Sequence, residues 1–152
     1  ENNLVLLLKE NVKLLKELDH SIEINLSTNS EKIILNSDKE QISRVFLNLI
    51  KNSVESIQQK AEKESNFNKK ITIELIESDS HINLIIVDNG IGFTKLSGNI
   101  KDILNPYFTT KKNGTGLGLS IVNKIVNDHN GKIEFIKKDD GAKIIIDFFK
   151  IT

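Results

Sequence analysis

An apolar run that ends in a carboxylate and two glycines constrains this chain more than any other stretch. Residues 82–87 read Ile-Asn-Leu-Ile-Ile-Val, and Asp88-Asn89-Gly90-Ile91-Gly92 follows directly. A carboxylate at the end of a buried strand is costly to desolvate unless donors reach it, so we expect Asp88 to face a cleft. The two glycines allow positive φ and leave no Cβ, which gives a flat ring such as a purine room beside the carboxylate. An Asx turn that only ends a strand explains the same residues.

Composition limits the classes of protein that fit. The 152 residues suffice for one domain, and 21 acidic side chains balance 21 basic ones, so no basic face for nucleic acid or an anionic membrane is expected. The absence of cysteine suits a reducing compartment such as the cytoplasm. No apolar run approaches the length of a membrane span, and the start lacks a signal-peptide pattern. Because the chain begins at Glu1 without a Met, we expect it to be part of a longer protein.

Hydrophobic periodicity divides the chain into helices and strands. Apolar residues recur at helical spacing in three segments and alternate with polar residues in several others. The expected helices span residues 3–18, 37–60 and 119–128. The expected strands span residues 22–26, 33–35, 71–75, 82–88, 132–136 and 143–149. Residues 61–70 read as a polar loop, and residues 93–113 as a long connection with a short helix at 97–104, typical of a lid or binding loop.

Local signals mark where these elements begin and end. Ser37-Asp38-Lys39-Glu40 has the form of a capping box and predicts the start of the second helix. Gly131 suits the left-handed conformation that ends a helix, and His129 just before it can cap helix carbonyls. A turn around Asp140-Gly141 is expected between the last two strands.

The second helix carries polar residues along its apolar stripe. At about 100° per residue, Asn48, Asn52 and Glu55 fall on one edge of that stripe. Two asparagines four residues apart beside a buried face need hydrogen-bond partners. They indicate either a ligand site or a polar seam satisfied by water and neighbouring backbone.

A second glycine cluster opens the third helix. Gly114-Thr115-Gly116-Leu117-Gly118 precedes an apolar pattern of helical spacing. Glycines at the start of a helix expose unpaired N–H groups at its positive end, which favours a phosphate. The cluster is not a Walker loop, because no Gly-Lys-Ser or Gly-Lys-Thr follows. With the glycines at 90–92 it brackets the 93–113 connection, which therefore looks hinged.

The order of these motifs resembles the catalytic ATP-binding domain of sensor histidine kinases, within the larger group that includes DNA gyrase, Hsp90 and MutL. Asn48 to Ser56 is similar to the family's N box, Asp88 to Gly92 to its first glycine box, Phe108 to its F box, and Gly114 to Gly118 to its second glycine box. The amino-acid sequence of the N box and of residues 106–111 is most similar to that of the nitrogen-regulation type of sensor kinase. The match covers about residues 1–150, so one catalytic domain at 1–152 is expected.

The resemblance implies an α/β fold of two layers, in which a mixed, mostly antiparallel sheet of five or six strands is covered on one face by three helices. This is the Bergerat ATP-binding fold. ATP would lie between the helical layer and the 93–113 segment.

The resemblance also implies roles for individual residues. Asp88 would accept a hydrogen bond from the adenine amino group, with Gly92 close to the ring. Asn52 would place its amide oxygen on Mg²⁺, with Asn48 at the same metal–phosphate edge, and Lys111 would either touch the γ-phosphate or be solvated. The residues implied to bind the nucleotide are Asn48, Asn52, Asp88, Gly90, Gly92, Phe108, Gly114, Thr115, Gly116, Leu117 and Gly118. The implied catalytic residues are Asn48, Asn52 and Lys111.

One residue type separates transfer of phosphate from hydrolysis within this group. In the family pattern of the gyrase-like ATPases, a glutamate that activates water stands where this chain has Asn48. An amide has no useful basicity, so Asn48 favours a kinase. Glu55 departs from the lysine of many sensor kinases, although an acid there looks usual for the nitrogen-regulation type.

None of the three histidines, His20, His81 and His129, lies in the sequence setting of a phosphoacceptor helix, and His20 and His81 are expected to be exposed. The resemblance therefore implies an acceptor histidine on a dimerisation helix upstream of Glu1, a homodimeric full-length kinase, and a response regulator as partner. The domain alone is expected to bind Mg·ATP and transfer little. Neither nucleic acid nor direct membrane contact is expected.

A second interpretation is a nucleotide-binding regulatory module, either similar to anti-sigma regulators or a degenerate kinase without histidine phosphotransfer. A third is a conformational ATPase of the gyrase kind.

Overall fold

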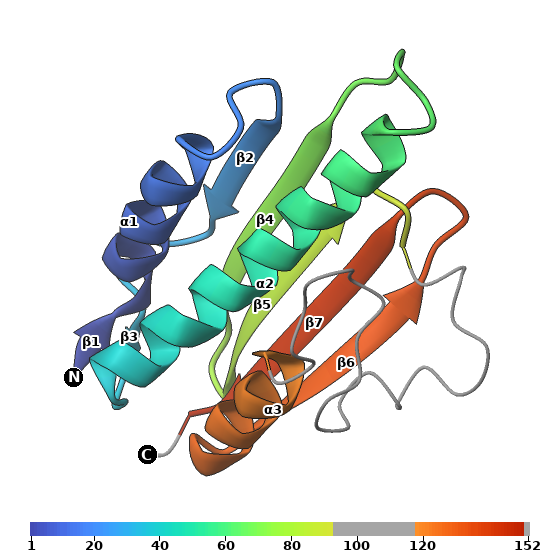
Figure 1. Cartoon of the computed structure of the whole chain (residues 1–152). Coiled ribbons are helices and arrows are strands. Elements are labelled where there is room, and N and C mark those ends of the chain that lie inside the picture. The colour runs from blue at the N-terminus through green and yellow to red at the C-terminus, as the bar shows by residue number, and fades with distance from the viewer. Residues whose placement is uncertain (93–117, 151–152) are drawn as a thin grey trace.

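The computed structural model describes residues 1–92 and 118–150, and Figure 1 shows the arrangement of their helices and strands. The helices are α1 (Leu4–Lys16), α2 (Lys39–Ala61) and α3 (Gly118–Asp128). The strands are β1 (Asn2–Asn3), β2 (Glu23–Thr28), β3 (Ile34–Leu35), β4 (Lys70–Glu77), β5 (His81–Asp88), β6 (Gly131–Lys137) and β7 (Ala142–Phe149). Within this part of the chain, no helix combines the length and apolar character needed to cross a bilayer.

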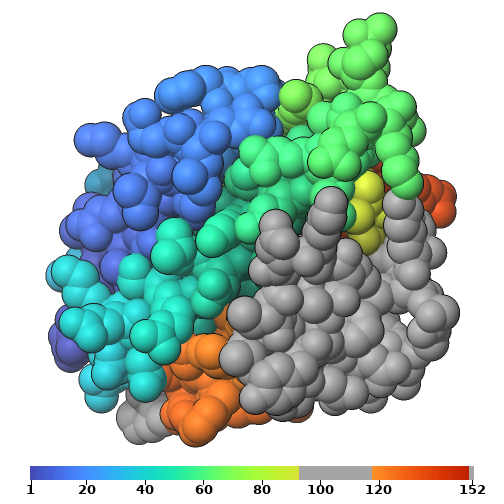
Figure 2. Space-filling model, viewed as in Figure 1, coloured from blue at the N-terminus to red at the C-terminus, as the bar shows by residue number. Residues whose placement is uncertain are grey.

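Five strands form one mixed sheet in the order β2-β4-β5-β7-β6. β2 pairs with β4 in parallel, and the other neighbours pair antiparallel. The three helices lie on one face of this sheet (Figure 1), and α1 and α2 lie against each other on that face (Figure 2). The expected fold of a mixed, mostly antiparallel sheet under three helices is confirmed.

The core lies between α2 and the centre of the sheet. Alternate residues of β5 turn toward the helices, as the period of two requires, and Asp88 is the last member of this inward row. The buried stripe of α2 meets that row, with Phe46, Leu49 and Ile57 fully shielded from solvent. An amphipathic helix over a half-apolar sheet therefore positions the carboxylate on the helical side of the strand end.

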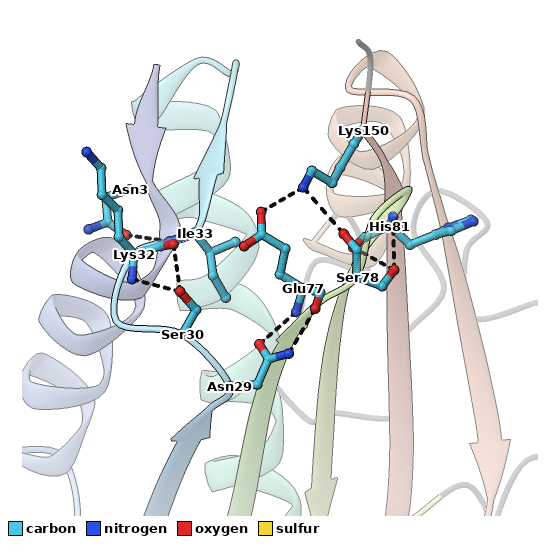
Figure 3. A network of polar contacts seen from close by, with 9 residues as sticks. All are labelled: Asn3, Asn29, Ser30, Lys32, Ile33, Glu77, Ser78, His81 and Lys150. Carbon is cyan, nitrogen blue, oxygen red and sulfur yellow. Dashed lines mark hydrogen bonds and ion pairs between the residues drawn. The ribbon is translucent and has the colours of Figure 1, made fainter.

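A polar network closes the end of the sheet opposite Asp88 (Figure 3). The side chain of Asn29 donates to the backbone oxygen of Glu77 at 2.8 Å and accepts from its backbone nitrogen at 2.9 Å. Lys150 Nζ lies 2.9 Å from the Glu77 carboxylate and donates to the Ser78 carbonyl at 3.3 Å. These contacts join the residue after β2, the β4–β5 turn and the residue after β7.

Most element boundaries agree with the sequence expectations to within a few residues, and two helix-end assignments are wrong. The N-cap of α2 is Asp38, whose side chain accepts from the backbone nitrogen of Gln41 at 3.1 Å, rather than Ser37. The left-handed residue after α3 is Asn130, with φ 58°, whereas Gly131 already begins β6. The short pairing of β1 with β3 was not expected, and the helix predicted at 97–104 lies outside the described residues.

Candidate nucleotide site

Asp88 ends β5 as a buried carboxylate, only 4% exposed. Its Oδ1 accepts a hydrogen bond from the backbone nitrogen of Gly90 at 2.9 Å. Burial raises the pKa of Asp88 above its usual range, whereas the Gly90 N–H and the Ser53 hydroxyl act to lower it. The local contact is an Asx turn, which agrees with the turn interpretation, and the cleft interpretation stays a prediction.

The backbone after Asp88 lies directly on α2. The Ile91 nitrogen donates to the Ser56 carbonyl at 3.3 Å, and the Gly92 nitrogen donates to the Ser56 hydroxyl at 3.4 Å. A Cβ on Gly90 would lie 2.6 Å from the carbonyl carbon of Ser56, so only glycine permits this approach. The space beside Gly90 is thus occupied by α2, and this glycine joins the strand end to the helix.

Gly141 supports the same strand end from the β6–β7 turn. It has φ +102°, and a Cβ there would lie 2.7 Å from the carbonyl carbon of Asp88. Gly92 has φ +65°, as expected for a left-handed position, and its own Cβ would lie 2.8 Å from the Gly141 carbonyl carbon. The backbone of Gly92 therefore packs against that of Gly141, which in turn packs against the backbone of Asp88. The sequence placed Gly141 only in a turn, and a glycine after Asp140 was the sole signal for it.

α2 carries the asparagines along the edge that meets Gly90 and Gly118. Asn48 is half-buried, and its Oδ1 lies 4.0 Å from the position that a Cβ on Gly118 would take. Asn52, one turn further, is half-buried and interacts with other parts of the protein, as does Glu55. Ser56 meets Gly90 another turn on. Asn48 and Ser56 are eight residues apart, about 12 Å along the helix, so one edge of α2 spans from the start of α3 to the end of β5.

This arrangement could hold an elongated ligand with a polar ring at one end and anionic groups at the other. The Asp88 end offers a carboxylate that accepts from an amine. The Gly118 end offers the first turn of α3, whose backbone N–H groups lie at the positive pole of the helix. The amides of α2 lie between these two ends.

Comparison with known proteins agrees with this geometry. Residues 37–152 match the family described as histidine kinase-, DNA gyrase B-, and HSP90-like ATPase. The chain belongs to this family.

Relatives place the chain among the sensor histidine kinases of this ATPase family. It is 35% identical over 150 residues to a protein of Rickettsia conorii (strain ATCC VR-613 / Malish 7) named as an NtrY-like sensor histidine kinase, covering 97% of this chain and 24% of that protein. It is 31% identical over 113 residues to the sensor histidine kinase ZraS of Escherichia coli O157:H7, covering 74% of this chain and 22% of that protein. The chain thus spans about a quarter of the length of these relatives. The expected likeness to nitrogen-regulation kinases is confirmed.

A solved structure of a histidine kinase catalytic domain has the same fold. The catalytic domain of histidine kinase ThkA in a nucleotide-free form superimposes with a TM-score of 0.82 at 29% identity, covering 98% of this chain and 93% of that one. A second structure contains ThkA in complex with the response regulator protein TrrA, with a TM-score of 0.79, 27% identity, and coverage of 99% and 41%. This chain is a catalytic domain of the sensor histidine kinase type.

Several residues predicted for this ATPase domain lie outside the described part. Gly118 begins α3, which agrees with the helix predicted after the glycine cluster. The other residues predicted for the F box and the second glycine box fall between residues 93 and 117, and so does the lysine predicted to touch the γ-phosphate. They are Phe108, Lys111, Gly114, Thr115, Gly116 and Leu117. Their roles, and the 93–113 lid, remain predictions.

No cluster of three or more histidine, aspartate or glutamate side chains that could hold a metal occurs among residues 1–92 and 118–150. The ligand set predicted for Mg²⁺ differs from such a cluster, because it consists of one amide oxygen and phosphate oxygens that the nucleotide itself brings. The half-buried position of Asn52 on α2 fits that role, which stays a prediction.

Lys60 is a residue of this site that the sequence did not single out. Its Nζ donates to the Asn89 carbonyl at 3.1 Å, forms an ion pair with Asp140, and lies 4.6 Å from the centroid of the Phe67 ring. The side chain is only 14% exposed. Lys60 therefore ties the end of α2 to the residue after Asp88 and to the turn that carries Gly141. Its position among polar neighbours near the helix end gave no sequence signal for these long-range contacts.

Proposed function

We propose that this domain binds Mg·ATP and donates the γ-phosphoryl group to a histidine on a separate dimerisation helix, as the catalytic part of a two-component sensor kinase. The observation that carries the proposal is the convergence on one edge of α2. The Asp88 carboxylate lies beside one end of that edge, and Gly118 at the start of α3 lies beside Asn48 at the other.

The residues of the chain divide the work of holding the nucleotide. Asp88 accepts from the exocyclic amine of adenine, and Gly92 lies close to the ring. The N-terminal turn of α3 faces the phosphates with its N–H groups. Asn48 and Asn52 orient the phosphate end through their amides, and Mg²⁺ neutralises charge on the phosphate oxygens when it is bound.

The identity of residue 48 supports transfer to a protein group over hydrolysis. Hydrolysis of ATP needs a general base within reach of a water molecule, and an amide cannot serve as that base. The described part of α2 has Asn48 at the position facing Gly118, and no carboxylate replaces it there.

The surroundings of the three histidines support an acceptor elsewhere. His81 begins β5 at the opposite end of the strand from Asp88, is half-buried rather than exposed as expected, and pairs with Asp147 at 2.8 Å. Both ring nitrogens of His129 are bonded, to the Ile125 carbonyl and the Asp38 nitrogen. His20 is exposed, as expected, near Glu17. None of the three adjoins the edge of α2 that runs from Asn48 to Ser56. We therefore place the acceptor on another segment of the full-length kinase, which would form a homodimer.

A response regulator is the proposed downstream partner. The solved complex of ThkA with TrrA concerns a relative that is 27% identical to this chain. By analogy, the phosphoryl group would pass from the acceptor histidine to an aspartate-bearing regulator.

Titration calorimetry of Mg·ATP into the chain tests the proposal, with Asp88→Asn as the variant and Asp79→Asn, in the exposed β4–β5 turn, as the matched control. We expect the wild type and the control to bind alike and the Asp88 variant to bind at least tenfold more weakly, since it loses a charge-assisted hydrogen bond. Equal affinity of all three proteins would remove the adenine assignment. Supplying the dimerisation segment should then yield acid-labile phosphate on histidine. Binding without such phosphate would favour the regulatory module instead.

A further inference from the structure

Ser53 is a buried residue whose hydroxyl makes no hydrogen bond of ordinary geometry to the described residues. It lies on α2 one residue after Asn52 and is 2% exposed. Within residues 1–92 and 118–150, its hydroxyl is the only buried side-chain polar atom without a hydrogen-bond partner. Asn11, the comparable buried polar residue of α1, is fully engaged by the Leu7 carbonyl and the Ser43 hydroxyl.

Alanine at position 53 would serve the fold better than serine. A buried hydroxyl without a partner costs free energy that a methyl group does not. Serine also has a lower helix propensity than alanine, because its side chain competes for backbone groups. Within the described residues the hydroxyl makes no hydrogen bond of ordinary geometry that would offset these costs, although it lies near enough to the Asp88 carboxyl to lower its pKa, so a role toward a ligand is the natural explanation.

Ser53 faces the end of the site where the ring is expected. It lies one helical turn before Ser56, whose carbonyl and hydroxyl hold the backbone of Ile91 and Gly92. It also adjoins Asp88 closely enough to act on that carboxyl, although the two side chains do not reach ordinary hydrogen-bond geometry. A hydroxyl and a carboxylate are thus buried side by side on the helical face of the strand end.

These two groups have complementary hydrogen-bonding capacities. An ionised carboxylate only accepts, whereas a serine hydroxyl can donate one hydrogen bond. The outer edge of adenine presents an amine that donates and, next to it, the ring nitrogen N1, which accepts. Guanine presents the reverse at the same two places, a carbonyl that accepts and an N1–H that donates. A carboxylate beside a hydroxyl donor therefore matches adenine and mismatches guanine.

We propose that the Ser53 hydroxyl donates a hydrogen bond to N1 of adenine, next to the Asp88 carboxylate that accepts from the amine, and that this pair selects adenine over guanine. The proposal deepens the ATP-binding function and rests on it. Ser53 is then a specificity-determining residue on the N-box helix, to which the family resemblance assigned no role.

A double-mutant cycle that combines Ser53→Ala with removal of the N1 atom from the nucleotide tests the contact between the hydroxyl and N1. Dissociation constants of Mg·ATP and of Mg·1-deaza-ATP, in which N1 is replaced by C–H, are measured for the wild type and Ser53→Ala. With ATP, the variant should bind about three- to tenfold more weakly, the value of one neutral hydrogen bond. With 1-deaza-ATP, the two proteins should bind equally. Ser43→Ala, which removes a hydroxyl ten residues earlier on the same helix, should leave both affinities unchanged.

Two further measurements separate recognition from a structural role. Ser53→Ala should melt at the same temperature as the wild type or higher, since it removes an unpaired buried hydroxyl. Its affinity for Mg·GTP should equal that of the wild type. The ratio of ATP affinity to GTP affinity should therefore fall by the same factor as the ATP affinity. A lower melting temperature with proportional loss of both nucleotides would assign Ser53 to the fold and overturn the proposal.

The outcomes distinguish this inference from the proposed function. Unchanged ATP affinity in Ser53→Ala, or an equal loss with ATP and 1-deaza-ATP, overturns the role of Ser53 while ATP binding by the wild type still stands. Absence of ATP binding by the wild type itself overturns the proposed function and this inference together.

Discussion

Gly90 lies against the backbone of Ser56 so closely that no side chain fits between them, and a Cβ on Gly90 would lie 2.6 Å from the Ser56 carbonyl carbon. The contact fixes the segment after Asp88 to the helix that carries Asn48 and Asn52. Motifs more than thirty residues apart in sequence therefore become one rigid unit. The strand end that carries Asp88 and the start of α3 keep their spacing because both pack against α2.

Replacing Gly90 by alanine should destabilise the domain. The new methyl group would meet backbone atoms of α2, which cannot move aside without distorting the helix, so the free energy of unfolding should fall by about 1–3 kcal/mol. Urea denaturation followed by circular dichroism measures the change. Gly118→Ala is the matched control, because among the described residues the nearest atom to the new Cβ would be Asn48 Oδ1 at 4.0 Å, and alanine favours a helix. Equal destabilisation of the two variants would contradict the proposed rigid contact.

The buried Asp88 carboxyl should make stability depend on pH in a definite direction. Its pKa is raised in the folded protein, mainly by burial, so the folded state holds this proton more tightly than the unfolded state. Stability from this group is therefore greatest when the pH is low enough for protonation. It declines as the pH rises above the ordinary value of 3.8 and through the raised pKa.

Urea denaturation over a series of pH values, for the wild type and Asp88→Asn, checks this direction. The free energy of unfolding of the wild type minus that of the variant should decrease with rising pH across the window and then level off. Asp19, whose pKa is lowered chiefly by its hydrogen bond with Ser21, contributes with the opposite sign in both proteins and cancels in the difference. A difference that is flat or increases with pH would show that burial does not dominate at Asp88.

The sequence was sufficient to predict the elements whose periodicity is strong. The alternation before Asp88 gave β5 and its inward carboxylate, and the apolar stripe of residues 42–57 gave α2 and its polar edge. These predictions succeeded because burial of one face decides both the element and its orientation. The motif order then led to the family.

Details that depend on contacts distant in sequence were not predictable. Ser37 looked like the N-cap of α2, but the side chain of Asn2 donates to its carbonyl at 2.6 Å and its hydroxyl at 3.1 Å, and Asp38 takes the cap instead. Gly131 looked left-handed, but its missing Cβ makes room for Phe148, which would lie 2.9 Å away. The left-handed residue is Asn130. Tertiary packing overrides local preference in both cases.

Lys60→Met should loosen the turn that supports Asp88. Methionine keeps much of the apolar stem of Lys60 but loses the hydrogen bond to Asn89 and the ion pair with Asp140. Because Asp140 is 68% exposed, the ion pair is screened by solvent, and we expect a loss of about 1 kcal/mol in the free energy of unfolding. Lys63→Met, at an exposed position three residues further, should change it by less than about 0.5 kcal/mol. Hydrogen exchange of the Gly141 amide should accelerate only in the Lys60 variant, and unaltered exchange would argue against the support.

His129 should be held in the less common neutral tautomer, with its proton on Nδ1. Its Nε2 lies 3.2 Å from the backbone nitrogen of Asp38, which can only donate, and its Nδ1 lies 2.7 Å from the Ile125 carbonyl, which can only accept. The ring thereby joins the end of α3 to the N-cap of α2. Nitrogen-15 chemical shifts of the imidazole identify the tautomer, and His20, exposed near Glu17, provides the reference. His129→Ala should lower the free energy of unfolding by about 1–2 kcal/mol through the loss of two hydrogen bonds. A proton on Nε2 would be incompatible with the Asp38 contact, and the link between the two helices would then have to be abandoned.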